Sequence, residues 1–131
     1  MPNSELVQNR VSAKKESNIA SRTFDFSLLI IKLCRKLDHD NIGRVLGKQL
    51  IRSGTSIGAN VREAQGSQSK ADFISKISIA QKEALETEYW LRLILADKLI
   101  SGDEILTVLN ESAQLIKILS SILISSKKNA R

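Results

Sequence analysis

The chain has 131 residues, 42% of them hydrophobic and 26% charged, which is the composition of one ordinary globular domain. A single cysteine excludes an intrachain disulfide and favours a reducing, cytoplasmic location, and the polar N-terminus predicts no secretory signal. The net charge of +6 raises the odds of a polyanionic partner, although a positive surface is also a common route to solubility.

Residues 1–20 contain few large apolar side chains in no sustained period, and we predict that they form a mobile arm. A first helix is expected over about Thr23–Leu37, where apolar residues recur at helical spacing. The predicted inner stripe of this helix is Phe24, Leu28, Ile31, Leu33 and Cys34, with Lys32, Arg35 and Lys36 facing out.

A second helix is predicted over about Ile42–Gln65, with Ile42, Leu46, Leu50, Ile57, Val61 and Ala64 as its inner stripe. It contains four glycines (43, 47, 54 and 58), each costing about 1 kcal/mol against alanine in a helix interior. The segment Ser53–Ala59 is nearly free of large side chains, so another helix could pack against it at short distance. The alternative is a kink or break near Gly54.

A third helix is predicted from the N-cap Ser69 to about Lys98, and a fourth begins at Ser101 with a capping box. The third helix has the alternating spacing of a bundle seam, and the fourth has its own inward stripe. The predicted inner residues are Phe73, Ile77, Ala80, Ala84, Thr87, Leu91 and Ile94, followed by Ile105, Leu109, Ile116, Leu119 and Leu123.

Short connections of about four residues predict antiparallel neighbours. The expected fold is therefore all-α, an antiparallel up-down-up-down four-helix bundle over residues 21–126, followed by a frayed basic tail at 127–131. The third and fourth helices show more apolar arc than a monomer can cover, which predicts a homo-oligomer, although irregular monomeric bundles also carry wide stripes. Polar residues interrupt the apolar run of the fourth helix, so no membrane span is expected.

Residues for catalysis or metal binding are nearly absent from the sequence. His39 is the only histidine and lies in a predicted turn, while Cys34 is expected to be a buried, inert thiol. One histidine and one cysteine cannot form a zinc site. We therefore predict no catalytic residue, no metal site, no cofactor and no small-molecule substrate.

The clearest candidate for binding is a basic segment. Between Asn41 and Arg62 there are four basic residues and no acid, and Arg44, Lys48 and Arg52 are spaced by four so that they line one side of a helix. With Arg62, this row is the predicted contact surface for the phosphates of RNA or DNA. A solvated face, or pairing with acids of the third helix, explains the same spacing.

Two linked motifs then show a resemblance. Leu46–Ala64 resembles the second-helix motif of the four-helix-bundle family named after ribosomal RNA intervening sequences, and Ala71–Phe73 with Lys82–Leu91 resembles its third-helix motif. The resemblance covers about Phe24–Ser120. It implies a cyclic homo-oligomer, usually a pentamer, with no established enzymatic activity. It also implies kinship with an accessory protein for the reverse transcriptase of diversity-generating retroelements.

The resemblance further implies a set of recurrent polar positions, interpreted as a buried network that fixes helix register and subunit packing. These positions are Arg52, Asn60, Glu63, Glu83 and Glu86. The leading hypothesis is a non-enzymatic, oligomeric accessory protein that binds nucleic acid with low specificity. The alternative is a protein-interaction module that binds another protein through its apolar surface. A metal-dependent hydrolase using the third-helix glutamates is disfavoured, because nearby arginines would pair with them.

Overall fold

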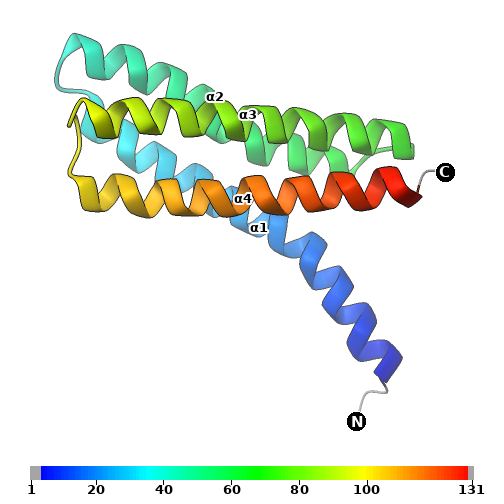
Figure 1. The fold of residues 1–131 in the computed structure, drawn as a ribbon. Coiled ribbons are helices and arrows are strands. Elements are labelled where there is room, and N and C mark those ends of the chain that lie inside the picture. The colour runs from blue at the N-terminus through cyan, green and yellow to red at the C-terminus, as the bar shows by residue number, and fades with distance from the viewer. Residues whose placement is uncertain (1–3, 130–131) are drawn as a thin grey trace.

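Four helices make up the chain in the computed structural model, which describes the backbone of residues 4–129 and the side chains of residues 18–129 (Figure 1). They are α1 (Ser4–Leu37), α2 (Asn41–Gln65), α3 (Lys70–Ala96) and α4 (Gly102–Asn129). Successive helices run antiparallel, and the contacting pairs are α1–α2, α2–α3, α3–α4 and, less extensively, α1–α4. The predicted up-down-up-down bundle is confirmed. Within the described residues α1 lies diagonally across from α3, and α2 from α4.

The first helix is much longer than predicted. It begins at Ser4 instead of Thr23, and its first turns project beyond the other three helices (Figure 1). No glycine or proline interrupts the sequence between Asn3 and Leu37, so nothing in it stops the helix from continuing. The predicted arm is therefore helical from Ser4 onward. Whether it is mobile stays a prediction, and residues 1–3 lie outside the described part.

Most of the predicted inward stripe of α1 is wrong. Phe24 and Leu28 are exposed to 66% and 53%, and Ile31 and Cys34 are only half-buried. Leu33 is buried as predicted, and the other core residues of α1 are Ile19, Thr23, Phe26, Ile30 and Leu37. Both stripes have helical spacing, but the buried one extends over the whole part of α1 that contacts the bundle. The longer stripe buries more apolar surface.

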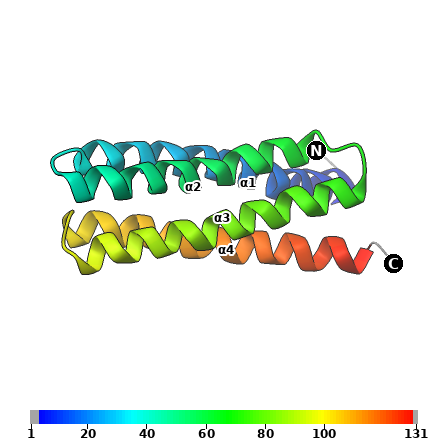
Figure 2. The ribbon, with the colours of Figure 1, turned by 90° about the horizontal axis from the view of Figure 1, so that it is seen from above.

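The glycines of α2 face α1, and α2 is a continuous helix without a break at Gly54. A Cβ atom on Gly54 would lie 2.8 Å from Cγ1 of Ile30, and one on Gly43 would lie 2.1 Å from the backbone oxygen of Leu37. Figure 2 shows the two helices side by side along their shared length. The predicted close packing is confirmed, and its partner is α1.

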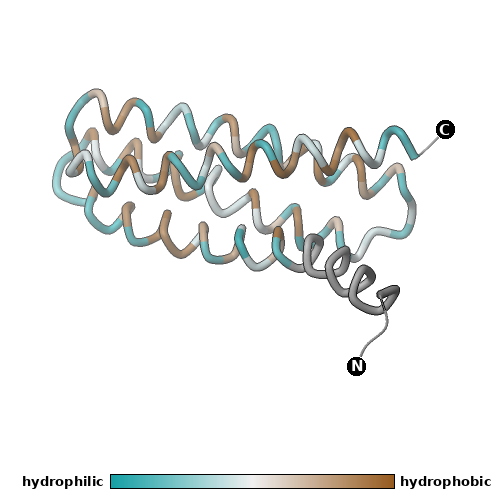
Figure 3. Tube along the Cα trace, turned by 60° about the horizontal axis from the view of Figure 1, so that its bottom comes forward, coloured by the Kyte–Doolittle hydropathy of each residue, from teal (hydrophilic) through white to brown (hydrophobic). Residues whose placement is uncertain are grey.

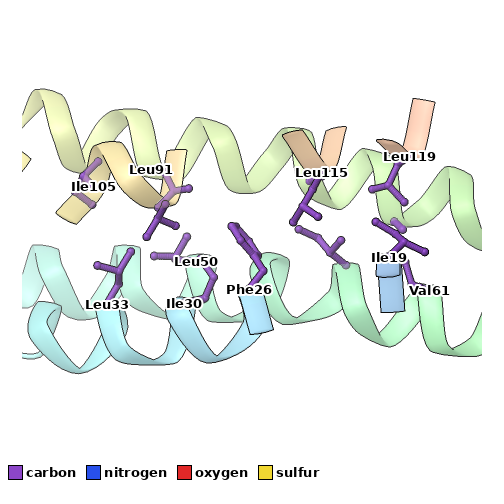
Figure 4. Packing of buried hydrophobic residues seen from close by; sticks show 14 of the residues in the cluster. Ile19, Phe26, Ile30, Leu33, Leu50, Val61, Leu91, Ile105, Leu115 and Leu119 are labelled. Atoms are coloured by element: carbon purple, nitrogen blue, oxygen red, sulfur yellow. The ribbon is translucent and has the colours of Figure 1, made fainter. Parts of the chain in front are cut away.

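The other core residues agree well with the periodicity. Every predicted inner residue of α3 except the half-buried Phe73 is buried, and in α2 the main exception is Ile42, which is 60% exposed. In α4, Leu109 and Ile116 lie at the edge of the core. The buried residues of α4 are Ile105, Val108, Ser112, Leu115, Leu119 and Leu123. Figure 3 shows hydrophobic positions recurring along each helix, and Figure 4 shows the buried side chains meeting between the helices.

By length and composition alone, α4 could cross a membrane. In the bundle, however, its buried stripe packs in the core with side chains from the other helices. Among the residues whose side chains are described, each helix also buries one hydroxyl residue, namely Thr23, Ser53, Thr87 and Ser112. The hydroxyls of Ser53 and Thr87 lie 2.9 Å apart and join α2 to α3.

Replacing Gly54 with alanine is expected to destabilise the protein by about 1–3 kcal/mol, because the added methyl group overpacks against the β-branched Ile30. Urea unfolding followed by circular dichroism would measure the change. Gly102→Ala is the matched control, since no atom lies within 4 Å of the position of its Cβ. Equal stability of the two variants would contradict the proposed close contact.

Candidate nucleic-acid interface

The basic row predicted from the sequence lies on the outward side of α2. Arg44, Lys48, Arg52 and Arg62 are all exposed, and the first three follow one another at intervals of one helical turn. Their ion pairs differ, however, and this difference decides which of them is available to a phosphate.

Arg44 is paired near the turn between α1 and α2. Its Nε lies 3.0 Å from Oδ1 of Asp38, and a guanidinium nitrogen lies 3.2 Å from Oδ1 of Asn41. The Asp38 side chain is 70% exposed, so water screens this pair and it contributes about 0–1 kcal/mol. A phosphate could therefore compete for Arg44. The neighbouring Asp40 is the N-cap of α2 and accepts the backbone N–H of Gly43 at 2.6 Å.

Arg52 is held more firmly, because it bridges α2 to two carboxylates of α3. One guanidinium nitrogen lies 3.2 Å from Glu83 and another lies 2.5 Å from Glu86. The indole Nε1 of Trp90 also donates to Glu86, at 3.4 Å. The hydrogen bond to Glu86 raises the pKa of Arg52, and the same bond lowers the pKa of Glu86. Arg52 is thus engaged in joining two helices.

The structure brings only part of the predicted polar network together. Arg52, Glu83 and Glu86 form one cluster, at the surface edge between α2 and α3, and the Arg52 side chain remains 49% exposed. Asn60 instead donates to the backbone oxygen of Ser56 at 2.8 Å, and Glu63 lies 3.6 Å from Lys76. These last two residues make their own contacts farther along α2.

Lys48 and Arg62 are the members of the row with no carboxylate within 4.0 Å among the described residues. They are therefore the cations of α2 that a phosphate could contact without displacing a protein partner. Lys48 lies between Arg44 and Arg52 along the helix, so the available positive charge is centred on the half of α2 near the α1–α2 turn.

The residues considered for catalysis are poorly placed for it. His39 lies exposed in the α1–α2 turn. Cys34 is half-buried with its sulfur 3.4 Å from the backbone oxygen of Gly47, and burial raises the pKa of this thiol to about 11. The reactive thiolate is therefore scarce at neutral pH. Within the described residues, no three His, Cys, Asp or Glu side chains are grouped as metal ligands.

Two exposed apolar stripes lie on diagonally opposite helices. The α1 stripe consists of Phe24 and Leu28 with the half-buried Ile31, and the α3 stripe consists of Leu85, Tyr89 and Leu93. Leu85 and Tyr89 are more than half exposed, and the ring of Tyr89 packs edge-on against Trp90. Both stripes lie on the side of their helix away from the core, so they face opposite directions.

Comparison with known proteins identifies the family. The family model described as "23S rRNA-intervening sequence protein" matches residues 15–121, which include most of the four helices. The chain belongs to this family. A solved structure from the S23 ribosomal protein family, from Bacteroides thetaiotaomicron, is 42% identical and superposes with a TM-score of 0.79. The alignment covers 83% of this chain and 97% of that protein, which is described as having unknown function.

Membership of the 23S rRNA-intervening sequence protein family agrees with the resemblance carried by the motifs of α2 and α3. A search of curated proteins finds no match. The first turns of α1 and the last turns of α4 extend beyond the residues that the family model matches.

The ion pair between Arg52 and Glu86 predicts a pH-dependent contribution to stability. Because the pKa of Glu86 is lower in the folded state, the contribution is full above the unfolded pKa of about 4.3 and is lost as the pH falls through the folded pKa. Arg52→Gln should therefore destabilise the protein at neutral pH and have progressively less effect below about pH 4.

Urea midpoints measured across this pH range would test the expectation. Arg92→Gln is the control, since Arg92 is exposed and has no carboxylate within 4.0 Å in the described part of the chain. A cost of Arg52→Gln that stays constant with pH would show that the pair does not titrate as proposed.

Proposed function

We propose that this protein is a non-enzymatic, oligomeric accessory protein that acts in the cytoplasm and binds RNA or DNA with low specificity. The observation that carries the proposal is the outward row of cations on α2, in which Lys48 and Arg62 are exposed without a carboxylate partner in the described residues. Arg44 adds a third cation through a weak, solvent-screened pair. Arg52 is a minor contributor, because Glu83 and Glu86 occupy it.

Low specificity follows from the kind of contact that this surface offers. Cations spaced along a helix bind phosphates, and phosphate contacts supply affinity without reading the base sequence. Base stacking on this row would need exposed aromatic rings beside it. The exposed Tyr89 lies on α3, and the exposed Phe24 belongs to an apolar stripe of α1.

Self-assembly is the second part of the proposal. An apolar stripe on α1 and another on α3 face opposite directions, so one copy can present its α1 stripe to the α3 stripe of the next. Such a heterologous contact generates a ring when the rotation closes. The family resemblance implies a homopentamer. The alternative function is a protein-interaction module. In that case a different protein, and not a second copy of this chain, would cover the stripes.

Substitutions in the α3 stripe should break the assembly. We expect the native chain to have the mass of an oligomer in light scattering, and Leu85→Glu with Tyr89→Glu to have the mass of a monomer, because buried charges at an interface are costly. Leu106→Glu is the control, since Leu106 is 54% exposed but lies on α4, outside both stripes. A monomeric native chain would favour the alternative function.

Nucleic-acid binding should fall steeply with salt and depend on the α2 row. Replacing Arg44, Lys48 and Arg62 with glutamine should lower the salt slope on duplex DNA by up to about 2.7, at about 0.9 for each lost phosphate contact. Fluorescence anisotropy with labelled RNA and DNA over a salt series would measure it. The matched control replaces Lys82, Arg92 and Lys117, three exposed cations of α3 and α4. If the native chain bound neither probe at low salt, this function would be excluded.

A further inference from the structure

A cation of α1, Arg35, faces the same side of the bundle as Lys48 of α2. The contact that sets the register of the two helices lies one residue before each cation, at Cys34 of α1 and Gly47 of α2. The sulfur of Cys34 lies 3.4 Å from the backbone oxygen of Gly47, and the Cβ position of Gly47 lies 3.7 Å from Cβ of Leu37. Cys34 and Gly47 therefore stand opposite each other at the contact between α1 and α2.

Helix geometry determines where the next residue on each helix points. One residue turns an α-helix by about 100°. Because α1 and α2 run antiparallel, this step takes Arg35 and Lys48 from the shared contact to the same outer side of the pair, away from the core. Both side chains are exposed, as this geometry requires. The two cations thus lie on the same outer side of the α1–α2 pair.

The two helices are also in close contact near the α1–α2 turn. Gly43 and Gly47 face α1 without side chains, and a Cβ on Gly43 would collide with the backbone of Leu37. Helices that pack through glycines approach more closely than the ordinary spacing of about 9 Å between helix axes, which brings side chains on their shared outer side nearer to each other.

The acids around this pair already have partners. Asp38 pairs with Arg44, Asp40 caps α2, and Glu104 forms an ion pair with Lys36. Neither Arg35 nor Lys48 has a carboxylate within 4.0 Å in the described part of the chain. An anion from outside the chain would therefore relieve their mutual repulsion.

We propose that Arg35 and Lys48 form a two-helix binding site for the phosphodiester backbone of nucleic acid, with Arg44 at its edge. The site rests on the proposed nucleic-acid function and deepens it, because it adds a residue of α1 to a surface otherwise drawn from α2. The guanidinium of Arg35 can donate two parallel hydrogen bonds to one phosphate, and Lys48 supplies a point charge beside it.

The test uses the full chain, a labelled RNA duplex and a labelled DNA duplex. Arg35→Gln and Lys48→Gln should each weaken binding about fivefold at about 0.15 M salt and lower the salt slope by about 0.9, and the double variant should lose about twice that slope. Arg35→Lys should keep the slope, because the charge remains. Arg92→Gln with Lys117→Gln changes the same residue types on α3 and α4 and should bind like the native chain.

The possible outcomes separate this site from the broader function. Loss of binding in the Arg44, Lys48 and Arg62 variant, with native affinity and slope in Arg35→Gln, would overturn the site and leave the function standing. Absence of binding by the native chain at low salt would overturn both. Equal affinity for polyglutamate and for RNA would show a site for acidic protein and would overturn the phosphodiester assignment. Native circular dichroism of each variant keeps the comparison valid.

Discussion

The contact between α1 and α2 at the glycines of α2 is the constraint on which the rest of the structure depends. At Gly54 the space of a side chain is filled by Ile30, and at Gly43 the backbone of α1 occupies it. Each glycine weakens an isolated helix by about 1 kcal/mol, so α2 is a good helix only when α1 covers it. This packing fixes the rotation of α1 about its own axis, and through it determines which of two apolar stripes enters the core.

The rotation of α1 is also where the sequence was least informative. Phe24 and Leu28 have the same helical spacing as Phe26 and Ile30, and hydrophobicity alone does not choose between them. The choice requires knowing that Ile30 has a glycine opposite it, which is a tertiary fact. By contrast, α3 has one long seam of small and branched residues beside a shorter apolar stripe, and periodicity predicted its buried face almost completely. The length of α1 escaped prediction because its first turns have no apolar period, although nothing in them breaks a helix.

For the candidate site too, the sequence predicted the local arrangement of residues but not their tertiary partners. Spacing by four was enough to place Arg44, Lys48 and Arg52 along one side of a helix, but it does not reveal their partners. Glu83 and Glu86 are 31 and 34 positions from Arg52 in the chain and reach it only because α2 and α3 pack antiparallel. Arg44 pairs with Asp38, which the α1–α2 turn brings next to it. Lys48 has no carboxylate partner among the described residues.

The proposed assembly and the proposed phosphate binding would make different demands on one face of the molecule, and the order of residues along α1 would reconcile them. Phe24, Leu28 and Ile31 continue at helical spacing into Arg35, so the outer face of α1 is apolar in its middle and basic near the α1–α2 turn. A neighbouring copy bound to the apolar part would leave the turn end of the bundle uncovered. Repeated around a closed ring, Arg35 and Lys48 of every copy would lie near one rim. Several weak phosphate contacts held at fixed spacing bind a long polyanion far more tightly than one copy does. On this argument, the apolar stripe serves nucleic-acid binding indirectly, by bringing many small basic sites together.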